Sequence, residues 1–357
     1  MLLRKHTLPR LMTFSPAFTH STAVQLQKWR ELKDLGEALE EHVLKPRRAQ
    51  GTRWINHRRK ALVALAANYR SLSVHLLQGA DEPGQGKVKL KAYWRQLTSS
   101  TFVLHMVLYQ DLLAELSELS LDFQADELSL SSVRSRVVAS QTALLRQREK
   151  PGPYLRPVLN AFTSTSSAGV FEFKGVAISH HSTSDEAFRH QRVEIVNRIT
   201  DCISQRFATF STDPVLLAAE IFDPHNMPEN ISAIDPYGDE EVQRLCEHFE
   251  PLLLSNGCNV AEVEREWLRA KHDIHQHHRR EAFFVLWHRM LTEKEAIYPN
   301  LLRIVLVFPV STAHVERQFS TIKRIQGDWR LRLKMKTIED LLLIKSQGCD
   351  PLEYQSE

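Results

Sequence analysis

The sequence predicts a mainly α-helical protein with little or no sheet. Glycine is scarce, at 12 of 357 residues, and leucine is abundant, a composition that favours helices over sheets with tight turns. Apolar residues recur every three to four positions through most of the chain, as they do along one face of a helix. Residues 170–178, VFEFKGVAI, depart from this pattern. Their alternation of apolar and polar side chains predicts one short strand or an irregular crossing segment.

Helical periodicity divides the chain into segments separated by stretches rich in turn-forming residues. The segments before the predicted strand cover residues 23–44, residues 61–78, two parts of 88–120, and 128–150. The segments after it cover residues 184–207, about 240–254, 260–292 and 299–348. The breaks fall at residues 79–86, 151–153, 164–169 and 222–240. Ser184 is a suitable N-cap for the helix that begins there.

The composition bounds the class of protein. Hydrophobic residues make up 43% and charged residues 25%, which is typical of globular proteins, and the length predicts two domains or one domain with a large insertion. No apolar run approaches the roughly 20 residues that span a membrane. We expect no membrane partner, no cofactor and no small-molecule substrate. The cysteines are too far apart for a paired-cysteine zinc site or a disulfide framework: Cys202, Cys246, Cys258 and Cys349.

A basic segment covers residues 45–60, which contain seven Lys or Arg residues and no acidic residue. Trp54 lies among them. Lys and Arg pair with phosphates, and an indole face stacks on an exposed base. The segment therefore predicts a nucleic-acid contact made by Arg53, Trp54, Arg58, Arg59 and Lys60. The alternative is a solvated basic turn, with Trp54 entering the core at the start of the next helix.

A histidine-rich segment, KHDIHQHHRRE, covers residues 271–281. The spacing of His272, His275 and His278 is compatible with metal binding, but the segment has no HExxH pattern and is heavily charged. We interpret it as a solvated helix face and expect no metal.

The segment STAHVERQFSTIKRI, residues 311–325, predicts a helix capped by Ser311 or Thr312. Its apolar stripe consists of Val315, Phe319, Ile322 and Ile325. A second amphipathic helix in residues 331–346 places Ile338, Leu341 and Leu342 in register. The two helices form a hairpin that either packs on its own domain or supplies a surface for a partner.

Residues 297–346 resemble the C-terminal dimerisation region of hobo/Activator-type (hAT) transposases. The shared residues are Pro309, Ser311, Glu316, Arg317, Phe319, Ser320, Arg330, Arg332, Leu333 and Leu341 to Leu343. Upstream, GTRWINHRR resembles the T-R-W element of the family, and AAEIFDPHNMP (218–228) resembles an A-x-x-L-D-P element. Within the family, the narrower resemblance is to domesticated vertebrate proteins of the zinc finger protein 862-like type.

The resemblance implies an RNase H-like core in which two aspartates and a glutamate hold divalent metal, with Glu316 at the position of that glutamate. It also implies that Trp54 occupies the position of a tryptophan that stacks on transposon-end DNA. Only one aspartate, Asp34, precedes Trp54, and it lies in a helical pattern. Two-metal chemistry needs several converging carboxylates. We therefore expect no catalytic residue here and interpret Glu316 as a relic.

These observations predict four regions and a function in assembly. The regions are a leader that is disordered and then helical, a helical hAT insertion-type domain, the hAT C-terminal dimerisation region, and a tail: residues 1–44, 45–296, 297–348 and 349–357. The fold implied by the resemblance is this helical insertion domain plus a C-terminal remnant of an RNase H-like core. We expect a catalytically inactive, domesticated hAT-like protein that forms homodimers, or heterodimers with another hAT-type protein, in nuclear or transcriptional regulation. The alternatives are non-specific DNA binding around Trp54 and an active metal-dependent transposase or nuclease. The cytoplasm is the alternative compartment.

Overall fold

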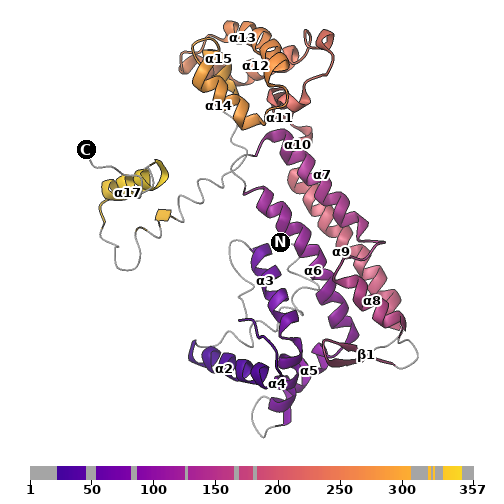
Figure 1. Ribbon diagram of the computed structural model, residues 1–357. Coiled ribbons are helices and arrows are strands. Elements are labelled where there is room, and N and C mark those ends of the chain that lie inside the picture. The colour runs from indigo at the N-terminus through magenta and orange to yellow at the C-terminus, as the bar shows by residue number, and fades with distance from the viewer. Residues whose placement is uncertain are drawn as a thin grey trace. The chain divides into compact units, whose positions relative to one another are not determined.

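The computed structural model confirms a mainly α-helical protein for the residues it describes (Figure 1). Those residues are 22–45, 54–81, 87–124, 128–164, 169–179, 183–306, 321–322, 325 and 333–347. The sheet found among them has two strands. No helix in these ranges is long and apolar enough to cross a membrane. The predicted disorder before residue 22 and the predicted tail from 349 lie outside the described residues.

The chain divides into two compact units. The N-terminal unit comprises residues 1–120 and 137–206, and the C-terminal unit comprises residues 121–136 and 207–357. The boundaries predicted from the sequence, at residues 44 and 296, stay predictions.

The N-terminal unit is built from helices around one long, buried helix. The elements are α2 (Thr22–Ala38), α3 (Trp54–Ala67), α4 (Tyr69–Asp81), α5 (Lys87–Leu97), α6 (Ser100–Asp122), α7 (Leu130–Arg146), α8 (Leu155–Ser164) and α9 (Thr183–Phe207). The start of α7, residues 130–136, belongs to the C-terminal unit. α6 is buried on most of its faces. α3 runs antiparallel to it, since Ser117 donates to the Asn56 side chain while the Gln110 amide donates to the Leu62 carbonyl at 3.4 Å.

The stretch predicted as one helix at 61–78 is divided between α3 and α4, with Asn68 at the junction. The Asn68 side chain accepts from the Leu44 N–H at 2.7 Å and donates to the Leu44 carbonyl at 2.6 Å. One side-chain amide thus satisfies both backbone groups of a residue far away in the sequence. Helical periodicity carries no signal of such a long-range contact.

Helix α8 was not predicted, because PGP at 151–153 marked only the end of the preceding helix. The buried Asp111 carboxylate on α6 accepts from the Tyr154 N–H at 3.0 Å and the Leu155 N–H at 2.9 Å, so it caps the start of α8. A Cβ on Gly152 would lie 2.3 Å from the Asp111 Cγ, which is why glycine is required there. The turn between α7 and α8 also contacts a buried cation, since Arg192 on α9 donates to the Gln147 carbonyl at 2.7 Å.

The structure corrects the prediction of one short strand or an irregular crossing segment at 170–178, because residues 170–179 form a β-hairpin. β1 (Val170–Phe173) pairs antiparallel with β2 (Val176–Ser179), and Phe173 lies opposite Val176. The two turn residues both have positive φ, +49° at Lys174 and +72° at Gly175. This is the geometry of a type I′ turn, whose twist matches that of the strands it joins.

The C-terminal unit is helical apart from a series of short turns. Its elements are α10 (Thr209–Thr212), α11 (Pro214–Ala218), η3 (Ala219–Phe222), η4 (Pro224–Asn226), η5 (Ile231–Ala233), α12 (Asp239–Ser255), α13 (Val260–Asp273), the π-helical turn η6 (Ile274–His278), α14 (Phe283–Lys294), α15 (Pro299–Val305) and α17 (Met335–Gln347). The prediction of one helix at 260–292 is therefore wrong. A π-turn and an extended residue, Ala282, interrupt it, with Ile274 fully buried.

Three aromatic rings form the centre of this unit. The Phe222 ring lies edge-on to Trp267, with centroids 5.6 Å apart, and edge-on to Trp287, at 5.8 Å. Both indole N–H groups are satisfied, Trp287 by the Phe222 carbonyl at 2.9 Å and Trp267 by the Tyr237 carbonyl at 3.1 Å. The rings join η3 to α13 and α14, so the element AAEIFDP is a core element of the C-terminal unit.

Candidate dimerisation region and the adjoining cavity

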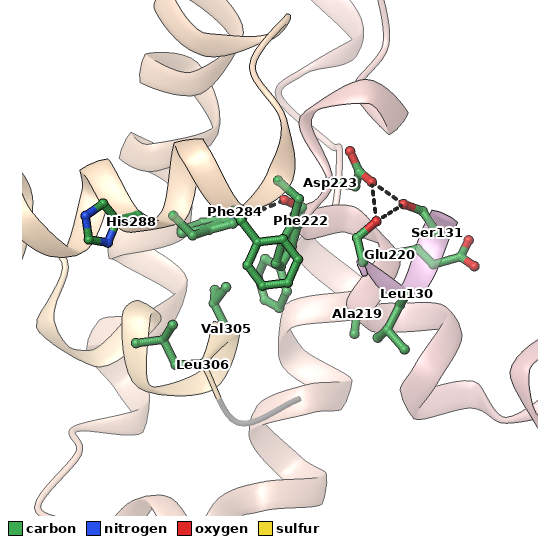
Figure 2. Close-up of a pocket in the computed structure, with 13 residues that line it drawn as sticks. Leu130, Ser131, Ala219, Glu220, Phe222, Asp223, Phe284, His288, Val305 and Leu306 are labelled. Atoms are coloured by element: carbon green, nitrogen blue, oxygen red, sulfur yellow. Dashed lines mark hydrogen bonds between the residues drawn. The ribbon is translucent and has the colours of Figure 1, made fainter. Parts of the chain in front are cut away.

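Asp223, the aspartate of the AAEIFDP element, is a buried connector. One carboxylate oxygen accepts from the His225 N–H at 3.1 Å and contacts the His225 ring nitrogen at 3.0 Å. The other accepts from the Ser129 hydroxyl at 3.3 Å and from the Ser131 hydroxyl. Figure 2 shows this carboxylate directed at the start of α7. Asp223 therefore fixes the chain near residue 130 to the turns that follow α11.

A cavity of about 220 Å³ opens beside this contact (Figure 2). Its walls are mainly apolar and come from α7, η3, α14 and α15: Leu130, Ala219, Phe222, Phe283, Phe284, Trp287, Val305 and Leu306. Its polar rim includes Glu220, whose pKa is raised by burial while Arg134, 3.2 Å away, opposes that shift. A space of this size and polarity accommodates an apolar side chain.

The start of α15 is held by a remote carboxylate. Glu266 on α13 is buried, and it accepts from the Asn300 N–H at 2.9 Å, the Leu301 N–H at 2.8 Å and the Asn300 side-chain amide at 2.6 Å. These backbone N–H groups lie in the first turn of α15, where no intrahelical acceptor exists. The negative charge also faces the positive end of the helix dipole. Glu266 thereby sets where α15 begins.

The histidine-rich segment differs from a solvated helix face. It lies on η6 and its flanks, and each predicted histidine has its own partner. His272 contacts the Asp235 carboxylate at 3.0 Å, His275 the Glu229 carbonyl at 3.3 Å, and His278 the Glu281 carboxylate at 3.0 Å. The His278 side chain is largely buried. Within the described ranges, no group of three or more His, Cys, Asp or Glu residues has a geometry that could hold a metal ion.

The predicted dimerisation residues fall into three groups. Val315 and Phe319, like Glu316, lie outside the described residues. Ile322, Ile325, Leu341 and Leu342 are half-buried within the single chain. Ile338 is only 3% exposed, so it packs inside this chain. Their role at a dimer interface stays a prediction.

The most exposed apolar side chains of α17 were not predicted as dimerisation residues, although Leu343 was named in the resemblance to the family. They are Met335, Leu343 and Ile344, with exposed fractions of 68%, 57% and 65%. The signal was available in the run LLLI at 341–344, because four consecutive residues at about 100° intervals cannot all face one side of a helix.

The predicted nucleic-acid residues lie at the start of α3. Trp54 is the first residue of that helix, and Arg53 lies outside the described residues. Arg58 and Arg59 are half-buried and Lys60 is exposed. The structure thus brings Arg58, Arg59 and Lys60 together on one turn of a helix that packs along α6.

Comparison with known families places this region in context. Residues 266–347 match the family model described as the hAT family C-terminal dimerisation region. No solved structure matches the chain. The match begins at Glu266, earlier than the boundary predicted at 297, and it includes η6, α14, α15 and α17.

The match supports a protein derived from an hAT transposase, and it supports self-association. The narrower resemblance to zinc finger protein 862-like proteins has no support from the comparisons.

Proposed function

We propose that this protein acts by self-association through residues 266–347, and not by cutting or joining DNA. The observation that carries the proposal is the match of this region to a dimerisation region, together with apolar side chains that α17 leaves exposed inside it. Apolar surface that stays in contact with water in one copy is stabilised when a second copy covers it.

The gain from covering α17 can be approximated from two residues. Full burial of a Leu or Ile side chain contributes about 1.5–3 kcal/mol. Leu343 and Ile344 each keep more than half of their surface exposed. A partner that covers both would contribute about 2–4 kcal/mol per protomer, and a twofold symmetric dimer would gain this contribution twice.

Multi-angle light scattering of the full chain tests the proposal. We expect a dimer at tens of micromolar, and we expect Leu343→Asp combined with Ile344→Asp to shift the species to a monomer. Leu252→Asp combined with Leu254→Asp is the matched control, because these leucines are 48% and 58% exposed on α12, outside the matched region. A monomeric wild type, or a double variant that dimerises like the control, would contradict the proposal.

The proposal extends to the role of the whole protein. The protein would be a domesticated, catalytically inactive hAT-type protein that retains a remnant of an RNase H-like core and pairs with itself or with another hAT-type protein in nuclear regulation. The resemblance of Glu316 to a catalytic glutamate is addressed by a metal-dependent strand-transfer assay. We expect neither wild type nor Glu316→Gln to act in it. Activity in the wild type that Glu316→Gln abolishes would overturn this part of the proposal.

A second candidate function is DNA binding through the start of α3. It is favoured by the clustering of Arg58, Arg59 and Lys60 on one turn beside Trp54. Retention on DNA that is unchanged by Trp54→Ala and by joint removal of the charges at Arg53, Arg58 and Arg59 would make this segment structural.

A further inference from the structure

Positive charge is concentrated in one part of the sequence. Between Glu41 and Asp111 there are 12 Lys or Arg residues and two acidic residues, a net charge of +10, while the whole chain carries +3. The remainder of the chain is therefore net negative, by 7 charges. Such segregation creates a local positive potential that the overall composition conceals.

Helix α5 displays part of this charge on its surface. It has four basic residues and no acidic residue in 11 positions, and all four basic residues are exposed: Lys87, Lys89, Lys91 and Arg95. At about 100° per residue, Lys87, Lys91 and Arg95 fall within an arc of about 80°. At about 1.5 Å rise per residue, they form a stripe about 12 Å long.

The opposite side of α5 is already covered. α4 and α5 form an antiparallel hairpin (Figure 1), because the Tyr69 hydroxyl donates to the Leu97 carbonyl at 2.5 Å and a Cβ on Gly79 would lie 3.0 Å from Leu90. Leu97 is fully buried and Leu90 is half-buried in this contact. The apolar side of α5 is thus occupied by its own unit, and its cations face solvent.

The stripe residues are not neutralised by acidic neighbours in the part of the chain that the structure describes. Other cations in the N-terminal unit have carboxylate partners, such as Lys33 with Glu37 at 3.2 Å and Arg70 with Glu41 at 4.0 Å. No ion pair is found for Lys87, Lys91 or Arg95 among the described residues. Three like charges on successive turns repel one another, and a polyanion relieves that repulsion.

The regular spacing of the cations, with Val88 as the one large exposed apolar side chain on α5, favours one class of polyanion. A lipid surface binds a helix through a free apolar face, whereas the apolar side of α5 lies against α4. A folded acidic protein needs a cluster of apolar anchors at the centre of its interface, whereas the exposed apolar side chains of α5 are a single large one, Val88 at 82%, and the small Ala92. Nucleic acid presents phosphates at regular intervals and needs only point charges to bind.

We infer that the exposed face of α5, carried by Lys87, Lys91 and Arg95, binds the phosphate backbone of nucleic acid without reading its sequence. The site lies in the N-terminal unit, so it is separate from self-association through residues 266–347. It is also distinct from the contact expected at Trp54 and the start of α3. Its contribution is electrostatic, and the binding constant must depend steeply on salt.

Fluorescence anisotropy of the full chain with a labelled 20-base-pair duplex of random sequence tests the inference, over a series of salt concentrations. The test variant combines Lys87→Gln, Lys91→Gln and Arg95→Gln. The matched control combines Lys150→Gln, Arg189→Gln and Arg206→Gln, which removes the same charge from exposed positions of the same unit. Circular dichroism and the unfolding midpoint establish that both variants fold like the wild type.

We expect the α5 variant to bind at least tenfold more weakly at low salt, because three phosphate contacts are lost. The slope of log K against log salt should fall in magnitude by about 2.7, from about 0.9 for each phosphate contact with duplex DNA. The charge-retaining variant Lys87→Arg, Lys91→Arg should bind like the wild type. Equal loss of affinity in the α5 variant and the control would overturn the site. Competition by polyglutamate as effective as that by unlabelled duplex would overturn nucleic acid as its ligand.

Discussion

Glu266 allows a stringent test of how the dimerisation region is held together, because one buried carboxylate serves three donors at the start of α15. The perturbation is Glu266→Gln, which preserves the length of the side chain. Glutamine retains one oxygen acceptor but replaces the second oxygen by an NH₂ group. That group is a donor facing donors, so either the two backbone N–H groups that share one oxygen or the Asn300 side-chain amide that binds the other loses its acceptor.

The magnitude follows from the contacts. A hydrogen bond to a charged group contributes about 1.5–3 kcal/mol, and a buried N–H without an acceptor costs about 1–3 kcal/mol. Because the remaining oxygen keeps part of the network, these contributions do not add fully. We expect the free energy of unfolding of the C-terminal unit to fall by about 2–4 kcal/mol.

The assay is native-state hydrogen exchange of peptides from residues 299–306, supported by urea unfolding. Every 1.4 kcal/mol corresponds to about a tenfold change in an equilibrium constant, so protection of the Asn300 and Leu301 amides should fall by about 30-fold or more. The control is Glu262→Gln, one turn earlier on α13, where the carboxylate is 41% exposed and pairs with Arg265 at 3.0 Å. An exposed pair of this kind contributes under about 1 kcal/mol.

The result that would refute the reasoning is equal exchange in the two variants. If the amides of α15 exchange as slowly in Glu266→Gln as in Glu262→Gln, the Glu266 carboxylate does not fix the start of that helix. A loss of protection spread evenly over the whole chain, with none concentrated at residues 299–306, would also contradict a capping role.

Two further predictions concern charge and backbone conformation. Burial and neighbouring carboxylates raise the pKa of Glu115. Its contribution to stability is therefore present below its ordinary pKa and is lost as pH rises through the folded-state pKa. Glu115→Gln should raise the urea midpoint at pH 7 and leave it unchanged near pH 3, and an equal effect at both pH values would contradict this. Gly238 has φ +79°, and a Cβ there would lie 2.8 Å from the Trp267 ring, whereas Gly257 has φ +68° with open space around it. Gly238→Ala should lower the free energy of unfolding by about 1–3 kcal/mol more than Gly257→Ala, and thermal unfolding that ranks the two variants the other way would refute the steric argument.

Much of the helical fold could be predicted from the sequence, because the apolar side chains that face a core recur at the period of the helix. The helix boundaries that the sequence did not predict share a cause. The break at Asn68, the start of α8 at Asp111, and the interruption after Asp273 each depend on a contact with a residue distant in the chain or on a buried side chain. The hairpin at 170–179 is different, since the two-residue turn at Lys174 and Gly175 was a local signal that the alternation alone did not resolve.

For the candidate site, too, the sequence predicted some features and only the structure showed the others. The resemblance of residues 297–346 to the hAT dimerisation region indicated the C-terminal site, and the match at 266–347 supports it. Residue identities also placed a basic segment near Trp54, since charge can be counted without a fold.

The tertiary structure decided which of these side chains are exposed to a partner. Ile338 is buried and Ile344 exposed, although both are isoleucines on α17, and Lys91 faces solvent because the apolar side of α5 lies against α4. The pattern of residue types determines which faces a helix has. The neighbouring elements that cover some faces and leave others in water determine which of them can bind.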